Sequence, residues 1–228
     1  NMAYTTIDDP TAFFQTVTYT GNGSSNAITG VGFQPDFNWL KNRSNTGEHL
    51  LVDAIRGMKN LRSNSNVAES SNSSIHQQSL DSDGFTVAGT GANSNTNGHT
   101  FVSWNWKTGT AFSNDASSTS VGSIDSAGSV NTTAGFSIIG YTGTGSAGTI
   151  AHGLGVKPSF ILFKNRQREV NWLVYDKKNG ANKFLYLNVT DAIGDDSGHF
   201  NDTEPTTSVF SVGGADGTNY SGENLIAY

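Results

Sequence analysis

One phrase of fourteen residues occurs twice in this chain, and it constrains the fold more than any other feature of the sequence. GVGFQPDFNWLKNR occupies residues 30–43 and GLGVKPSFILFKNR occupies residues 153–166, with half of the aligned positions identical. The flanking phrases also match, since YTGNG at 19–23 corresponds to YTGTG at 141–145. A correspondence that extends beyond one short motif indicates a duplicated structural unit rather than a chance match.

The correspondence continues through most of the chain. HLLVDAIRG at 49–57 aligns with WLVYDKKNG at 172–180, and NGHTFVSW at 97–104 aligns with SGENLIAY at 221–228. We therefore predict two tandem units joined by a linker rich in Ser, Thr, Gly and Ala, with room for an edge strand. The predicted segments are an N-terminal arm at 1–15, a first repeat at 16–106, the linker at 107–134 and a second repeat at 135–228.

Composition and turn chemistry favour an all-β fold. Only 14% of the 228 residues are charged, whereas aromatic residues reach 11% and glycine occurs 27 times. Many turns around an aromatic-rich core are typical of all-β proteins. Five dipeptides of the kind that form tight hairpin turns support this prediction: Asn22-Gly23, Asp83-Gly84, Asn97-Gly98, Asn179-Gly180 and Asp216-Gly217.

The repeated phrase is typical of a buried strand that ends in a polar rim. In the first copy, Gly30, Gly32 and Pro35 are expected to shape the turn that enters the strand. Phe37 is then expected to pack in the core. The segment HLLVDAIRGMKNL at 49–61 has some helical spacing, but its aligned counterpart is typical of strand, turn and strand, so we predict a hairpin in both copies.

Charge, cysteine content and hydropathy disfavour several classes of function. A formal net charge of -6 without any basic run argues against binding to nucleic acid, because that affinity comes from Lys and Arg. The chain has no cysteine, which excludes thiolate catalysis, disulfides and Cys-based zinc sites. The longest apolar stretches are strand-sized and the N-terminal segment lacks the pattern of a secretory signal, so we predict no membrane span.

Two acidic residues, Asp53 and Asp176, occupy matching positions in the two units. Carboxylates bind calcium and sugar hydroxyls, so both residues are candidate ligand contacts, and calcium is the cofactor that the sequence leaves open. The alternative, which we prefer, is a structural salt bridge to a neighbouring strand. The expected partners are the repeated bases, Lys41 or Arg43 in the first unit and Lys164 or Arg166 in the second.

Two looser acidic groups carry weaker signals. DSDG at 81–84 resembles the start of a calcium loop but lacks the remaining ligands, so we predict a turn there. Asp195, Asp196 and Asp202 form a second acidic group, which stays open as a metal site.

Four further residues are candidate contacts with a ligand or partner. Phe13 and Phe14 form an apolar pair near the N-terminus, and such a pair favours docking on another surface. Trp172 is a candidate platform for stacking a sugar ring. His49, which aligns with Trp172, is not accompanied by a nucleophile elbow, so we predict no catalytic residue.

Several phrases together resemble a known family. They are AYTTIDDPTAFFQ, YTGNG, GFQPDFNWLKNRS, DAIRGMKNLRSN, SDGFTV and FVSWNWKTG, followed by TAGFSIIGYTGTG, AHGLGVKPSFILFKNR and NLIAY. Over nearly its whole length the chain is similar to an uncharacterised tandem repeat of virion structural proteins from tailed phages, mainly marine ones. The resemblance implies β-sandwich units of jelly-roll or lectin-like type in tail fibres or other exposed parts of the virion. It transfers no catalytic residue.

Sequences of this kind usually continue beyond the final AY with a cysteine and an aromatic residue, and then with further repeats. We therefore expect the chain to be a fragment of a longer protein.

The leading functional hypothesis is a non-enzymatic module of a phage tail fibre or appendage that contacts a host-surface glycan or protein. It places the protein in the virion, after assembly in the host cytoplasm, next to other virion proteins. A homo-oligomer is expected, with a trimer as the first guess. A capsid decoration or head-fibre protein is the alternative. A polysaccharide-degrading enzyme is the third hypothesis, and it requires two carboxylates on facing strands.

Overall fold

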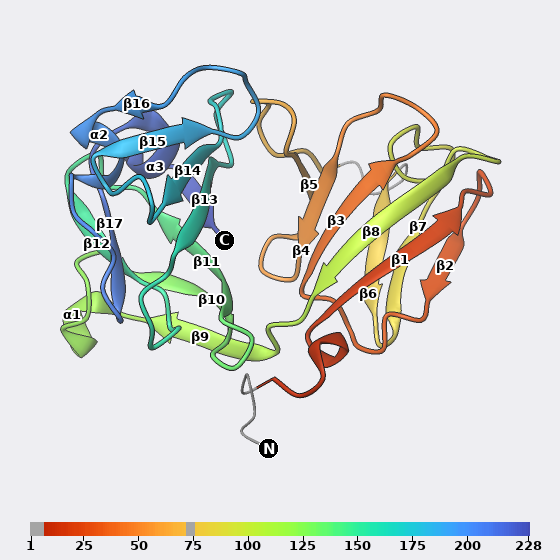
Figure 1. Ribbon diagram of the computed structural model, residues 1–228, viewed down its shortest axis with the longest axis horizontal. Coiled ribbons are helices and arrows are strands. Elements are labelled where there is room, and N and C mark those ends of the chain that lie inside the picture. The colour runs from red at the N-terminus through yellow and green to blue at the C-terminus, as the bar shows by residue number, and fades with distance from the viewer. Residues whose placement is uncertain (1–6, 72–75) are drawn as a thin grey trace. The chain divides into compact units, whose positions relative to one another are not determined.

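The computed structural model describes residues 7–71 and 76–228, and almost all of its regular structure is β-strand (Figure 1). This confirms the predicted all-β class. The chain divides into two compact units, one of residues up to 63 and 69–109 and the other of residues 64–68 and 110–228. No helix in the described part of the chain is long and apolar enough to cross a membrane.

In its described residues, the first unit contains eight strands and one short 3-10 helix. They are η1 (Pro10–Ala12), β1 (Phe14–Thr20), β2 (Asn26–Thr29), β3 (Phe37–Asn42), β4 (Leu50–Asp53), β5 (Gly57–Arg62), β6 (Gln77–Asp81), β7 (Gly84–Val87) and β8 (Thr100–Trp106). A five-stranded antiparallel sheet has the order β1-β8-β3-β4-β5, and a three-stranded sheet has the order β2-β7-β6.

The two sheets of the first unit face each other across one hydrophobic core. Leu40 and Leu50 come from the five-stranded sheet, and Ile28, Phe85 and Val87 come from the three-stranded sheet. All five side chains are buried. Apolar burial between two sheets is the main stabilising contribution in a β-sandwich, so the predicted sandwich architecture is present in this unit.

The second unit contains ten strands and three helices of four residues each. They are β9 (Thr110–Asn114), α1 (Ala116–Thr119), β10 (Ser126–Asn131), β11 (Phe136–Thr142), β12 (Gly148–Ala151), β13 (Phe160–Asn165), β14 (Leu173–Asp176), β15 (Lys183–Tyr186), β16 (Gly194–Asp195), α2 (Ser197–Phe200), β17 (Val209–Val212), α3 (Asp216–Asn219) and β18 (Asn224–Ala227). The larger sheet has the order β16-β15-β14-β13-β18-β11-β10-β9, and β12 pairs with β17 in a second sheet.

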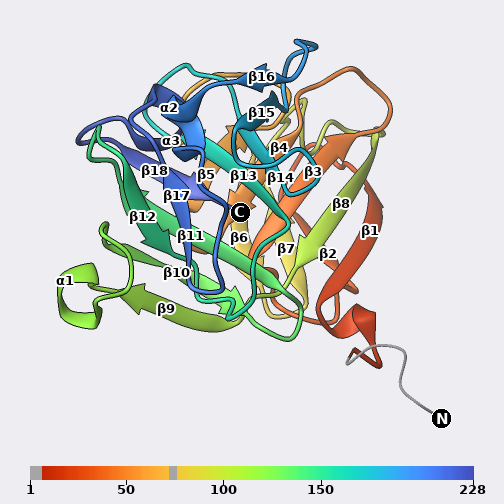
Figure 2. The same cartoon turned by 60° about the vertical axis from the view of Figure 1, so that its left-hand side comes forward.

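The predicted linker at 107–134 is wrong, because most of it belongs to the large sheet of the second unit. β9 pairs along β10, and β10 pairs along β11 (Figures 1 and 2). Small residues serve this packing: a Cβ at Gly128 would lie 1.8 Å from the carbonyl oxygen of Ile138. The Ser, Gly and Ala composition therefore reflects close strand contact here rather than a flexible connection.

The predicted arm is also too long at its C-terminal end. Residues 1–6 of the arm lie outside the described residues. Asp9 caps η1 by accepting a hydrogen bond from the backbone N–H of Thr11, and β1 already begins at Phe14. The Phe14 ring lies 4.8 Å from that of Trp106, and the Trp106 ring lies 5.1 Å from that of Phe37. Phe14 is thus part of the five-stranded sheet.

The order of five strands in the first unit has a counterpart in the second, where β11-β18-β13-β14-β15 follow one another in the larger sheet. The pairing registers correspond as well, because Phe37 pairs with Asp53 and Phe160 pairs with Asp176. The hairpins predicted from the aligned segments are confirmed as β4–β5 and β14–β15. This correspondence is what a duplication requires, and the duplication itself stays a prediction.

The turn that enters β3 has the backbone that its glycines predicted. Gly30 and Gly32 have φ values of 88° and 82°, which residues with a Cβ rarely adopt. Their N–H groups donate to the carboxylate of Asp83 in the β6–β7 turn, at 3.1 and 2.6 Å. The Gly32 and Gly30 N–H groups hold the pKa of Asp83 below its ordinary value. The DSDG segment is therefore a hairpin turn, as predicted.

A buried asparagine ties two loops together in each unit. In the first unit, Asn95 is fully buried and donates to the carbonyls of Ser24 and Gly89, while its Oδ1 accepts from the Asn22 N–H. The amide thereby joins the loop after β1 to the loop after β7. Since irregular backbone inside a protein needs partners for its polar groups, this side chain fixes both loops.

The second unit has the same arrangement around Asn219, which is also fully buried. Its amide donates to the carbonyls of Ser146 and Gly213 at 2.6 and 2.7 Å, and its Oδ1 accepts from the Thr144 N–H at 2.8 Å. We call Asn95 and Asn219 the clasp asparagines.

A tyrosine reinforces each clasp, half-buried in the case of Tyr19 and buried in the case of Tyr141. The hydroxyl of Tyr19 donates to the Ser94 carbonyl at 2.7 Å, and the hydroxyl of Tyr141 donates to the Thr218 carbonyl at 2.6 Å. Burial raises the pKa of both phenols, so both stay protonated as donors at physiological pH.

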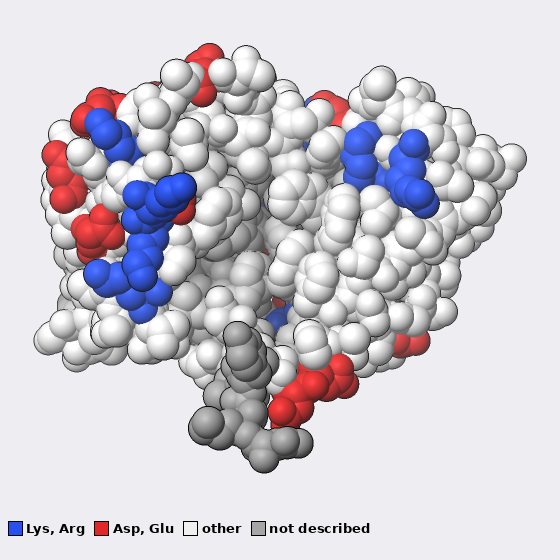
Figure 3. Space-filling model, in the orientation of Figure 1, with Lys and Arg blue, Asp and Glu red and all other residues white. Residues whose placement is uncertain are grey.

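Acidic and basic side chains lie next to each other on the face of the second unit that Figure 3 shows. In the second unit, an ion pair joins Lys183 of β15 to Asp195 of β16, with 2.5 Å between Nζ and Oδ2. Exposed pairs of this kind contribute little to stability, about 0–1 kcal/mol each.

Replacing a clasp asparagine should destabilise its unit strongly. We expect Asn95→Ala to lower the free energy of unfolding by about 2–4 kcal/mol, because buried carbonyl and N–H groups lose their partners. Urea titration followed by tryptophan fluorescence measures the change. Asn97→Ala is the matched control, since Asn97 lies two residues away and is exposed. Equal stability of the two variants would contradict the structural role of Asn95.

Candidate functional site

The structure distributes the six predicted contact residues over both units instead of gathering them in one site. Asp53 is fully buried, and its carboxylate accepts from the backbone N–H groups of Ile55 and Arg56. It also pairs with the Arg56 guanidinium at 2.5 Å, while Arg56 reaches Glu69 at 3.1 Å. Asp53 thus forms a structural salt bridge, but its partner is Arg56 in the turn after β4 and not, as predicted, Lys41 or Arg43 on a neighbouring strand.

Asp176 has a local role of a different kind. Its carboxylate accepts from the Lys178 N–H at 3.3 Å and from the Asn179 side-chain amide at 2.8 Å. These contacts shape the turn after β14. Both partners lie in its own turn, whereas the prediction placed Asp176 in a salt bridge to Lys164 or Arg166.

The aromatic candidates are less available than the sequence suggested. Trp172 is fully buried, with its ring stacked 6.3 Å from that of Tyr228, so it offers no open platform for a sugar. Phe13 and His49 are half-buried, and Phe14 is 37% exposed. Burial, followed by the charge of Lys41, lowers the pKa of His49.

The repeated Lys-Asn pair holds the loop that follows the buried strand. Lys41 donates to the carbonyls of Asn42, Asn45 and Gly47 at 2.8–3.1 Å. Lys164, fully buried, donates to the carbonyls of Asn165 and Arg168 at 2.7 and 2.9 Å. An ammonium that satisfies several loop carbonyls is a structural device, so this repeated lysine is not presented to a ligand.

The repeated asparagines bridge to a second loop. Asn42 donates to the Ala92 carbonyl at 2.8 Å, and Asn165 donates to the Asp216 carbonyl at 2.9 Å. Ala92 and Asp216 therefore occupy equivalent places in the two units.

The loose acidic group of the second unit is also engaged locally. Asp195 pairs with Lys183, and Asp196 caps α2 by accepting from the Gly198 N–H at 2.7 Å. Within residues 7–71 and 76–228, no three His, Asp or Glu side chains come together as a metal-binding group.

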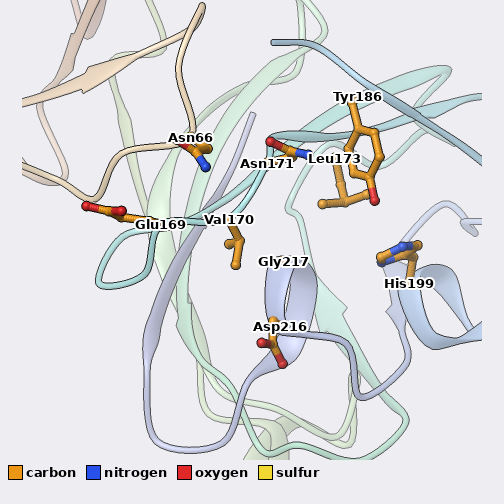
Figure 4. Close-up of a pocket in the computed structure, with 9 residues that line it drawn as sticks. All are labelled: Asn66, Glu169, Val170, Asn171, Leu173, Tyr186, His199, Asp216 and Gly217. Atoms are coloured by element: carbon orange, nitrogen blue, oxygen red, sulfur yellow. The ribbon is translucent and has the colours of Figure 1, made fainter. Parts of the chain in front are cut away.

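A pocket of about 310 Å³ in the second unit combines several groups that the sequence did not single out. Figure 4 shows the His199 ring directed towards it, with Tyr186 on the same side and Asp216 on α3. Its lining residues are Asn66, Glu169, Val170, Asn171, Leu173, Tyr186, His199, Asp216 and Gly217. Asn66 belongs to the segment 64–68 that is grouped with this unit.

Four elements and two irregular segments contribute to the lining, with Leu173 at the start of β14 and Asn66 in the segment 64–68. Tyr186 ends β15, His199 lies in α2, and Asp216 begins α3. Glu169 and Asn171 lie in the loop between β13 and β14 that Lys164 holds in place. A strand end, two short helices and a loop fixed by Lys164 therefore position these groups.

His199 is the most unusual group in the pocket. It is only 9% exposed, and its Nδ1 is buried without a hydrogen-bond partner. Its Nε2 lies 4.0 Å from Asp196, and its ring lies 4.3 Å from that of Phe184. Burial lowers the pKa of His199, against a smaller opposing effect of Asp196, so the imidazole is neutral near pH 7. A buried ring nitrogen without a partner departs from the rule that buried polar groups are hydrogen-bonded, which sets His199 apart from the other lining residues.

Charge around the pocket is mainly negative. Asp216 is 54% exposed, and Glu169 is a second carboxylate in the lining. The nearby Arg168 is engaged elsewhere, since it binds Glu223 at 2.8 Å and stacks 3.7 Å from the ring centroid of Tyr220. Its Nη1 also lies 4.0 Å from Oδ2 of Asp216, in a long ion pair. The lining therefore favours neutral or cationic ligands.

The pocket occurs at a position where the aligned units differ. Gly217 is equivalent to Asn93, because Asp216 and Ala92 are equivalent. In the first unit, Asn93 extends to Glu48, accepting from its N–H at 2.9 Å and donating to its carboxylate at 3.2 Å. A Cβ at Gly217 would approach the Leu173 side chain to 2.3 Å, so a larger residue there would require Leu173 to shift. Comparison of the two repeats, position by position, was the sequence signal that could have identified the site.

The buried Lys164 gives the second unit a defined pH dependence. Burial lowers its pKa to about 8, with Glu169 acting in the opposite direction. Between pH 8 and pH 10.5, which is the ordinary pKa of a lysine, Lys164 keeps its proton in the unfolded chain but has lost it in the folded chain. The contribution of Lys164 to the free energy of unfolding therefore rises with pH across this window, by roughly 1–3 kcal/mol.

This dependence can be measured by urea unfolding at pH 7, 8, 9 and 10. We expect the free energy of unfolding of the wild type, relative to that of Lys164→Met, to increase with pH. Lys157→Met, at an exposed position, should follow the pH profile of the wild type. Parallel profiles for the wild type and Lys164→Met would show that the lysine does not titrate in this range.

Comparison with known proteins gives one family. A family model described as a domain of unknown function, DUF7483, matches residues 9–228. No curated protein and no solved structure shows a significant match to the chain.

Proposed function

We propose, on the premise that this chain belongs to the DUF7483 family of domains of unknown function, that it is a non-enzymatic structural protein of a phage virion. Its place is a tail fibre or similar appendage, where it contacts a receptor on the host surface. The resemblance of its sequence phrases to virion repeats of tailed phages motivates this proposal. Other virion proteins are its neighbours, and we expect a homo-oligomer, with a trimer as the first state to test.

The observation that carries the proposal is the fixation of loops by buried polar side chains. Asn95 and Asn219 each hold two loops, and Lys164 holds the loop that lines the pocket. Loops ordered before binding lose little conformational entropy when a partner docks. Rigid loops on a β-sandwich support a receptor-binding role, and a host-surface glycan or protein is the proposed partner.

A capsid decoration protein is the second candidate, and one observation favours it. Val156 and Phe160 of the second unit are 55% and 54% exposed, whereas the aligned Phe33 and Phe37 of the first unit are buried. An exposed apolar pair on a polar protein favours contact with another protein. A capsid surface supplies such a contact without any host receptor.

A polysaccharide-degrading enzyme is the third candidate, since Glu169 and Asp216 both line one pocket. Two carboxylates are the usual catalytic groups of glycoside hydrolysis. Release of reducing ends from host capsule by the purified chain would overturn the non-enzymatic proposal.

Immunogold labelling of intact virions tests the proposed location. Antibody raised against the chain should label the tail periphery, because an adhesive appendage is exposed there. Label over the head would instead identify a decoration protein. Absence of label from virions that package the other structural proteins normally would contradict a virion role altogether.

A further inference from the structure

We propose that the pocket of the second unit binds one pyranose ring of a glycan, and that it selects neutral or amino sugars over sugars that carry a carboxylate. This inference rests on the proposed receptor-binding function and specifies its ligand.

The size of the pocket fits a single ring. Its volume of about 310 Å³ is at the lower end of the range for ligand pockets, roughly 300–1,000 Å³. An extended polymer groove is a different kind of site. A terminal or branching sugar is therefore the part of a glycan that this pocket accommodates.

The hydrogen-bonding groups of the pocket match sugar hydroxyls, which both donate and accept. The Asp216 carboxylate accepts hydrogen bonds, and it is 54% exposed. The Oδ1 of Asn171 accepts from Asn188 at 2.9 Å, which leaves the NH₂ group of Asn171 to donate. The imidazole of His199 completes the polar part of the lining.

An apolar surface adjoins these polar groups, as sugar binding requires. Leu173 and Val170 contribute aliphatic surface, and Tyr186 contributes an aromatic ring. Phe184 supports that side of the pocket, with its ring 5.2 Å from that of Tyr186 and 4.3 Å from that of His199. The C–H face of a pyranose packs on such a surface while its hydroxyls meet the polar groups.

Selection against acidic sugars follows from the charges. Glu169 and Asp216 repel a carboxylate, and His199 brings no positive charge because burial keeps it neutral. Arg168 has Glu223, Tyr220 and, at 4.0 Å, Asp216 itself as partners, so its charge is already engaged. An ammonium group on an amino sugar is attracted by the same carboxylates.

Saturation-transfer NMR on the whole chain tests the inference with five probes: glucose, galactose, glucosamine, N-acetylglucosamine and glucuronic acid. We expect saturable signals for at least one neutral or amino sugar and none for glucuronic acid. Asp216→Ala should weaken binding about tenfold or more, because a hydrogen bond to a charged group contributes about 1.5–3 kcal/mol and 1.4 kcal/mol corresponds to tenfold.

Asp195→Ala is the matched control, since Asp195 lies in the same unit, is 59% exposed and does not line the pocket. It should bind as the wild type does. His199→Gln provides a second variant that keeps a polar group at the same position, and we expect weaker binding with an unchanged melting temperature.

Three outcomes would overturn the inference: no saturable signal with any neutral or amino sugar, equal binding of glucuronic acid, or equal losses in Asp216→Ala and Asp195→Ala. Failure of sugar binding together with gold label at the tail periphery would reject only the ligand assignment. Sugar binding by a chain that is absent from virions would reject the virion role and retain the pocket.

Discussion

The structure depends on one constraint, which is that the loops between sandwich strands must satisfy their backbone polar groups without the help of a sheet. Asn95 and Asn219 meet this constraint by binding two loops each from a fully buried position. Tyr19 and Tyr141 add a further donor at equivalent places. Because these loops are irregular, their conformation is set by the side chains that bind them rather than by strand pairing.

Residues that recur in the two units are mostly structural, and the candidate site lies where the units differ. Lys164 and Asn165 repeat Lys41 and Asn42, and all four bind loop carbonyls. The lining of the pocket instead includes Gly217, where the first unit has an asparagine. Repetition within one chain thus indicates which residues the fold requires, and divergence indicates where a binding role can be sought.

Local signals predicted much of the fold. Alternating strands, hairpin turns and the positive φ of Gly30 and Gly32 were all accessible, because they depend on short stretches of chain. The segment 107–134 was misassigned, since small residues are shared by flexible linkers and by closely packed strands. Gly128 shows the second case, in which a strand neighbour leaves no room for a Cβ.

The sequence by itself determined the all-β class, the correspondence of the two halves and the turns, because each follows from residue spacing or from backbone preference at individual positions. Only the tertiary structure decided that Asp53 is buried with Arg56, that Trp172 is enclosed, and that His199 and Asp216 line one pocket. Burial and the meeting of side chains depend on how distant segments pack, and composition at a single position does not specify this.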